Sequence, residues 1–209
     1  MDDLTAPPDS VNAINKDCSV CAKQRCAKGK DCYPLANSGI KDLYFEADNY
    51  KLAQAAAAIE AGHYLQATRL EEIRLFAQEM GFDKLGIATC IGLIEEAQTV
   101  AAYLKTYFSV SVIICKNGGL NKKTFSLKQI DEDAAEVMCN PIGQALFLNQ
   151  QNTDMNIICG LCVGHDMLFT KYSNAPVTTL IVKDRVLAHN PAAVLYSKYY
   201  RRRVLGLWK

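Results

Sequence analysis

Residues 84–115, KLGIATCIGLIEEAQTVAAYLKTYFSVSVIIC, predict the fold of this chain of 209 residues. The segment 84–89 is short and apolar, as expected for a buried strand, and 109–115 is rich in the β-branched residues that favour strands. Between them, residues 93–107 carry apolar positions at helical spacing. A strand, a helix and a second strand in this order are typical of a parallel sheet.

The same alternation continues towards the C-terminus. Asn140 followed by Pro141 is typical of a helix start, and we expect that helix to run to about Asn149. Residues 155–159 (MNIIC) and 177–182 (VTTLIV) predict two more strands. The sequence therefore predicts an α/β fold: a Rossmann-like three-layer domain with a mostly parallel sheet of about four strands.

Further elements surround this pattern. A short helix is expected over 164–172, and a last helix after Asn190-Pro191. Residues 186–188 are a candidate antiparallel edge strand. Upstream, the sequence predicts helices over 53–58 and 64–80, separated by Gly62 and ended by Gly81.

Composition divides the chain into three parts. We expect residues 1–15 to be a disordered lead-in, 16–40 a cysteine-rich metal-binding segment, and 41–209 the α/β domain. Half of the residues are hydrophobic and the net charge is +1, which is ordinary for a globular protein and argues against nucleic acid as a partner. Met1–Ser10 has no apolar core and no apolar run reaches the length of a membrane span, so we expect a cytoplasmic protein without a membrane partner.

Four cysteines lie within fifteen residues near the start of the chain, spaced C-x2-C-x4-C-x5-C: Cys18, Cys21, Cys26 and Cys32. Four thiolates can surround one tetrahedral zinc ion or hold one iron–sulfur cluster. The lysines and arginine between them favour thiolate over thiol. The alternative, a pair of structural disulfides, needs an oxidising compartment and fits poorly with an odd total of nine cysteines. The spacing thus predicts a metal centre without deciding between zinc and a cluster.

The other five cysteines follow predicted strands or precede predicted helices. Strand C-termini share one edge of a parallel sheet, and ligands bind at that edge. The candidate second metal or thiol site therefore comprises Cys90, Cys115, Cys139, Cys159 and Cys162, with His165 as ligand or base. The alternative is that these cysteines pack as small hydrophobic residues, which suits Cys115 and Cys159 at the ends of apolar strands.

Two further functions remain open. A strand-edge thiol with a nearby base would suit a thiol-dependent redox enzyme. Backbone amides at Gly118-Gly119, Asn140 and Gly164 would suit a module that binds a small anionic ligand. No G-x-G-x-x-G or phosphate-loop motif is present to decide between them.

Three stretches resemble a known family. They are residues 139–193 (CNPIGQALFLNQQNTDMNIICGLCVGHDMLFTKYSNAPVTTLIVKDRVLAHNPAA), residues 86–93 (GIATCIGL) and the opening four-cysteine motif. The chain resembles, from about Cys18 to its C-terminus, the uncharacterised cysteine-rich proteins grouped as domain of unknown function 1847 and described as predicted metal-binding proteins. The resemblance implies metal binding and assigns no catalytic residue.

Overall fold

The computed structural model describes residues 18–32 and 39–207. The predicted lead-in, 1–15, lies outside the described residues. Two compact units divide the chain, residues 1–54 and 55–209. The predicted α/β fold is confirmed, and it lies in the second unit.

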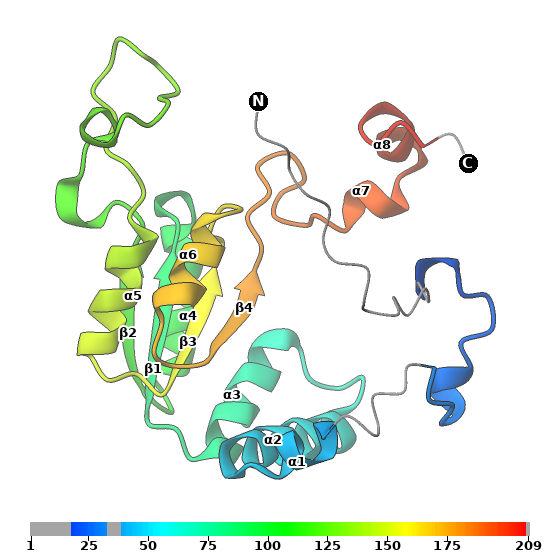
Figure 1. Cartoon of the computed structure of the whole chain (residues 1–209). Helices are drawn as coiled ribbons and strands as arrows, with labels where there is room; N and C mark the ends of the chain where they lie inside the picture. Colours follow the sequence, from blue (N-terminus) through cyan, green and yellow to red (C-terminus); the bar gives the residue numbers. More distant parts are fainter. Residues whose placement is uncertain (1–17, 33–38, 208–209) are drawn as a thin grey trace, which may run out of the picture. The chain divides into compact units, whose positions relative to one another are not determined.

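The sheet of this unit has four strands, all parallel, in the order β2-β1-β3-β4 (Figure 1). The strands are β1 (Lys84–Thr89), β2 (Ser109–Ile114), β3 (Met155–Cys159) and β4 (Val177–Ile181). Central strands β1 and β3 are buried almost throughout, whereas edge strands β2 and β4 are half-buried. The four predicted strands are confirmed to within one residue at their ends.

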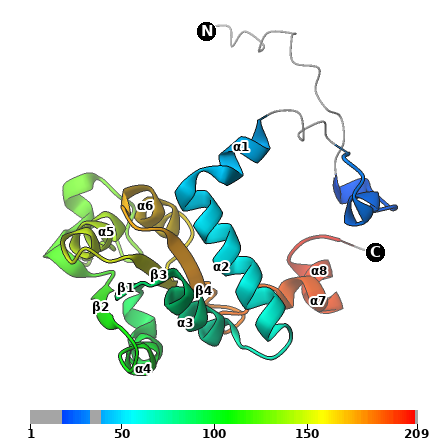
Figure 2. The same ribbon diagram turned by 90° about the horizontal axis from the view of Figure 1, so that it is seen from below.

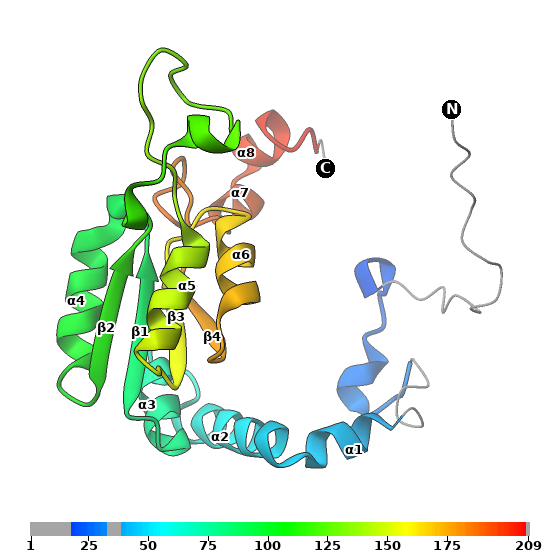
Figure 3. The same cartoon turned by 60° about the vertical axis from the view of Figure 1, so that its left-hand side comes forward.

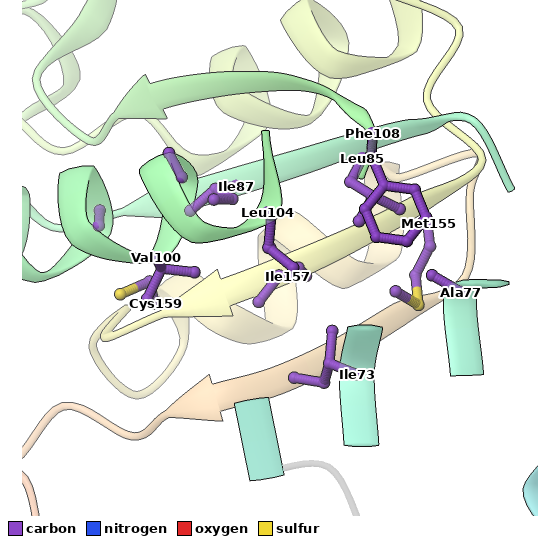
Figure 4. Close-up of a cluster of buried hydrophobic side chains, with 12 residues drawn as sticks. Ile73, Ala77, Leu85, Ile87, Val100, Leu104, Phe108, Met155, Ile157 and Cys159 are labelled. Carbon is purple, nitrogen blue, oxygen red and sulfur yellow. The ribbon is translucent and has the colours of Figure 1, made fainter. Parts of the chain in front are cut away.

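Helices cover both faces of the sheet (Figure 2). Helices α3 (Arg69–Met80) and α4 (Ile94–Leu104) contribute to one hydrophobic cluster, and α5 (Pro141–Gln150) and α6 (His165–Tyr172) to the other. Figure 4 shows the first cluster, in which Ile73 and Val100 lie with strand residues such as Ile157. The domain therefore has the three layers that the strand–helix alternation predicts.

The strand order reverses between β1 and β3. The chain moves from β1 through α4 to β2, then returns past β1 through α5 to reach β3. Crossovers in parallel sheets are almost always right-handed, so this reversal places α4 and α5 on opposite faces. The crevice at such a reversal, beside the strand C-termini, is where open α/β sheets bind ligands.

Local signals explain the helix boundaries. The Asn140 side chain accepts a hydrogen bond from the Gly143 N–H at 2.8 Å, and Pro141 is the first residue of α5, as predicted. Gly81 ends α3 in the left-handed conformation, also as predicted. The boundary predicted at Gly62 is wrong, because helix α2 (Ala47–His63) continues through it.

Helix α3 begins five residues later than predicted. Leu65 has a φ of +58°, which interrupts the helix, and Thr68 forms a capping box with Glu71. The box satisfies backbone N–H groups at the start of α3 and so favours a new helix start over continuation.

The remaining elements are short. Helix α1 (Ile40–Phe45) precedes α2, and α7 (Ala193–Tyr196) and α8 (Lys198–Arg203) follow the sheet. The candidate edge strand at 186–188 is wrong, because these residues lie in a turn. Asp184 fixes that turn by accepting hydrogen bonds from the N–H groups of Val186 and Leu187 at 2.9 Å each.

Five single turns of 3-10 helix complete the described residues. Two are in the four-cysteine segment, η1 (Cys18–Val20) and η2 (Arg25–Lys28). Another, η3 (Ile91–Leu93), leads into α4. The last two, η4 (Asn117–Gly119) and η5 (Lys122–Phe125), lie in the long connection between β2 and α5. This connection rises from the C-terminal ends of the strands (Figure 3).

Candidate functional site

The strand C-termini carry most of the later cysteines. Cys90 follows β1, Cys115 follows β2, and Cys159 is the last residue of β3, three positions before Cys162. Cys139 comes from the connection after β2 and lies immediately before the cap of α5. These cysteines lie along one edge because the strands are parallel. The surroundings of their thiols nevertheless differ from one cysteine to the next.

Cys115 and Cys139 are in direct contact. Their sulfur atoms are 3.6 Å apart, and the Ile91 N–H donates a hydrogen bond to the Cys115 sulfur at 3.3 Å. Cys115 is buried and Cys139 is half-buried. Burial is the main reason why the pKa of the Cys115 thiol rises to about 12, and the nearby charges of Cys139 and Cys90 act in the same direction.

Cys162 contacts a cation. The Arg185 guanidinium donates a hydrogen bond to the Cys162 sulfur at 3.0 Å. This bond, with smaller contributions from the charges of Cys162, Cys90 and Cys139, raises the pKa of Arg185. Arg185 therefore interacts electrostatically with three of the cysteines at this edge of the sheet.

Cys159 belongs to the hydrophobic core. It is fully buried in the cluster between the sheet and helices α3 and α4 (Figure 4). Burial raises the pKa of its thiol, and its carbonyl accepts a hydrogen bond from the Thr89 hydroxyl at 3.0 Å. These surroundings agree with the alternative to a metal or thiol site, in which Cys159 packs as a small hydrophobic residue.

His165 begins helix α6 and is half-buried. Burial is the main cause that lowers the pKa of its imidazole, and the positive charges of Lys116, Lys122 and Arg185 lower it further. Asp166 acts in the opposite direction. The neutral imidazole is therefore favoured, the form that can serve as a base or a metal ligand.

In the four-cysteine segment, two tight turns each start at a cysteine. The Cys21 N–H donates to the Cys18 carbonyl at 3.2 Å, and the Gly29 N–H donates to the Cys26 carbonyl at 2.9 Å. Hydrogen bonds from the backbone N–H groups of Gln24 and Lys23 lower the pKa of the Cys21 thiol. Residues 18–31 are exposed and Cys32 is half-buried, so no hydrophobic core supports this segment.

Within 18–32 and 39–207, no group of three or more His, Cys, Asp or Glu side chains is arranged to hold a metal ion. Both predicted ligand sets therefore remain predictions. The same described ranges contain no helix with the length and apolar character needed to cross a membrane.

Sequence reasoning missed several residues at the sheet edge. Arg185 is not among the predicted site residues, although it lies four residues after β4 and the strand-end rule that selected the cysteines would have found it. Asn117 donates its side-chain amide to the carbonyls of Ile114 and Asn140, at 2.9 and 3.1 Å. No sequence signal marks this contact between the two ends of the connection from β2 to α5.

Comparison with known proteins identifies a matching protein family. The model of the family described as protein of unknown function (DUF1847) matches residues 31–180. This range includes Cys32 and all five later cysteines, whereas Cys18, Cys21 and Cys26 precede it, so the family match is narrower than the resemblance expected from about Cys18 to the C-terminus.

The chain was also compared with individual proteins of known sequence and with solved structures. The uncharacterized protein MJ0455 of Methanocaldococcus jannaschii is 50% identical over 188 residues, which cover 90% of this chain and 97% of that protein. No solved structure matches the chain significantly. The family match spans well over half of the sequence and the relative covers nearly all of it, so this chain belongs to the DUF1847 family.

Proposed function

We propose that this chain is a metal-binding protein whose N-terminal cysteines, Cys18, Cys21, Cys26 and Cys32, hold one zinc ion or one iron–sulfur cluster as thiolates. The observation that carries the proposal is the Cys21 sulfur, which accepts two backbone N–H groups inside a segment without a hydrophobic core. Amide N–H groups directed at a sulfur favour its charged form, which is the form that ligates a metal.

The donor set fits the proposed centre chemically. Four cysteines are a complete ligand set both for structural zinc and for a cluster. Four basic side chains and only one acidic side chain lie between Cys18 and Cys32, and their charge offsets part of the negative charge of four thiolates. Asp31 is the acidic one.

The local fold supports gathering of the ligands. Each of the two turns brings the chain back on itself immediately after a cysteine. The described arrangement is not itself a closed ligand sphere, so the four side chains would close around the metal as it binds. Coupling of this kind between binding and folding is common in small metal-binding segments.

The test is the composition of protein purified without oxygen. We expect about one zinc per chain, or iron with matching acid-labile sulfide and visible absorption, since clusters absorb visible light and zinc does not. Replacing Cys21 by Ser should remove most of the metal. Cys159→Ala, which alters a core thiol, is the matched control and should retain the metal.

Full metal content in each of the four single variants, Cys18→Ser, Cys21→Ser, Cys26→Ser and Cys32→Ser, would disprove the proposal. Loss of metal in Cys139→Ser but in none of these four would instead move the centre to the sheet edge.

A further inference from the structure

The contact between Cys115 and Cys139 joins two distant parts of the sequence. The sulfurs lie 3.6 Å apart, although 24 positions separate the residues. The adjacent backbones are joined as well, because the Asn140 N–H donates to the Cys115 carbonyl at 2.7 Å. A disulfide bond is about 2.05 Å long, so the two sulfurs must approach by about 1.5 Å to form one.

A polar network holds the two ends of the connection from β2 to α5 together beside this contact. The Asn117 amide donates to the Asn140 carbonyl at 3.1 Å, and the Asn140 amide donates back to the Asn117 side-chain oxygen at 3.1 Å. The space is closely filled, because a Cβ at Gly143 would lie 2.3 Å from the Asn117 side-chain oxygen. The thiols are therefore held in position by the fold.

The two thiols differ in access. Cys115 is only 2% exposed, whereas Cys139 is half-buried. The Cys139 sulfur lies between the buried Cys115 sulfur and the surface, since the two sulfurs are in contact and only Cys139 is partly exposed. A reagent from solution would therefore meet Cys139 first.

We propose that Cys115 and Cys139 form a reversible dithiol–disulfide couple that exchanges with a low-molecular-weight disulfide. The Cys139 thiolate attacks one sulfur of the small disulfide, forms a mixed disulfide and releases one small thiolate, which takes up a proton. Cys115 then loses its proton and attacks the Cys139 sulfur, which releases the second small thiolate. Overall, two cysteine thiols give up two electrons and two protons, and one disulfide becomes two thiols.

The surroundings of Cys115 suit the resolving role. The Ile91 N–H, 3.3 Å from its sulfur, stabilises negative charge on it during the second step. Burial is the largest cause that raises the pKa of Cys115, and formation of the mixed disulfide removes a smaller one, the Cys139 charge. The couple does not depend on the N-terminal metal centre, so either proposal can fail alone.

The experiment equilibrates the native full-length protein with mixtures of oxidised and reduced glutathione, followed by blocking of thiols and peptide mapping. Trypsin cleaves after Lys116 and Lys128, and Asp-N cleaves before Asp133 and Asp154, so Cys115 and Cys139 fall in separate peptides that contain no other cysteine. We expect a Cys115–Cys139 cross-link that forms in oxidising mixtures and disappears in reducing ones.

Single variants separate the two steps. Cys115→Ser should accumulate glutathione on Cys139, whereas Cys139→Ser should leave Cys115 unmodified in the folded protein. Cys159→Ala, as the matched control, should leave the cross-link unchanged. Absence of the cross-link from the native protein, or a link from Cys139 to Cys90 or Cys162 instead, would overturn the proposal without affecting the metal assignment.

Discussion

At the scale of single residues, burial divides the cysteines into chemically different groups. Cys18, Cys21 and Cys26 are exposed, Cys90, Cys115 and Cys159 are buried, and Cys32, Cys139 and Cys162 are intermediate. A thiol reacts as its thiolate, and burial in apolar surroundings disfavours that form. The same side chain can therefore serve as a ligand in one place and as packing in another.

The first prediction concerns alkaline pH. The pKa of the Cys115 thiol is raised from 9.0 to about 12 in the folded protein, mainly by burial. The unfolded chain therefore loses this proton first, so the contribution of Cys115 to stability is present below pH 9 and is lost as the pH rises towards 12. Urea denaturation across this range should show a falling free energy of unfolding.

Cys115→Ser should make this pH dependence shallower, because serine does not titrate in that range. Cys159 contributes in the same direction, since burial also raises the pKa of its thiol. An unchanged slope in Cys115→Ser would contradict the assignment.

At the scale of elements, helix α3 depends on its first residues. The Thr68 N–H donates to the Glu71 carboxylate at 2.8 Å, and the Glu71 N–H donates to the Thr68 hydroxyl at 3.4 Å. Ile73 and Ala77 of this helix are buried against the sheet. The cap therefore stabilises an element that covers one face of the domain.

The second prediction tests this cap. Thr68→Ala removes the hydroxyl and should lower the free energy of unfolding by about 1 kcal/mol. Thr68→Ser keeps the hydroxyl and should retain most of that stability. Chemical denaturation of the two variants measures the difference, and equal stabilities would show that the cap contributes little.

The third prediction compares two glycines beside β3. Gly160 and Gly164 both have left-handed backbones, with φ values of +80° and +83°. A Cβ at Gly160 would lie 1.9 Å from a methyl carbon of buried Leu93, whereas a Cβ at Gly164 would meet nothing within 4 Å. The pair separates backbone strain from steric overlap.

Gly164→Ala should cost about 1–2 kcal/mol, the usual strain of a left-handed residue with a side chain. Gly160→Ala should cost a further 1–3 kcal/mol or so, because the core around Leu93 must shift. Thermal or urea denaturation gives both values, and equal losses would exclude a steric contribution at Gly160.

At the scale of the whole molecule, the two compact units, 1–54 and 55–209, have different sources of stability. The second unit contains both hydrophobic clusters and the complete sheet. In the described four-cysteine segment of the first unit, residues 18–31 are exposed and Cys32 is half-buried. Removal of the proposed metal should therefore affect the units unequally.

The fourth prediction follows from this difference. Replacing Cys18, Cys21, Cys26 and Cys32 together by Ser should speed hydrogen exchange in residues 18–32. The thermal unfolding of the α/β unit, followed by circular dichroism, should change little, since exposed substitutions usually alter stability by about 0.5 kcal/mol or less. A large fall in the unfolding temperature would instead show that the four-cysteine segment supports the sheet.

The sequence by itself determined the four strands of the α/β unit, the helices between them and the parallel arrangement of the sheet. Alternation of apolar strands with amphipathic helices is a local property, and so are the Asn140-Pro141 start of α5 and the Gly81 end of α3. The placement of cysteines at the strand edge follows from the same pattern. Among the predicted strands, only the candidate at 186–188 is not formed, because hydrogen bonds to Asp184 hold these residues in a turn.

Only the tertiary structure decided the strand order and the surroundings of each thiol. The sequence does not show which face α5 covers, and that choice places β3 beside β1 on the side opposite β2. Cys159 joins the same cluster as Met155 and Ile157, as alternation along β3 gives, but which helices cover that face depends on the fold. The contact of Cys115 with Cys139 joins the two ends of the connection between β2 and α5, and the contact of Cys162 with Arg185 joins the segments after β3 and β4. Such contacts depend on how the loops pack at the sheet edge, which is a property of the folded chain.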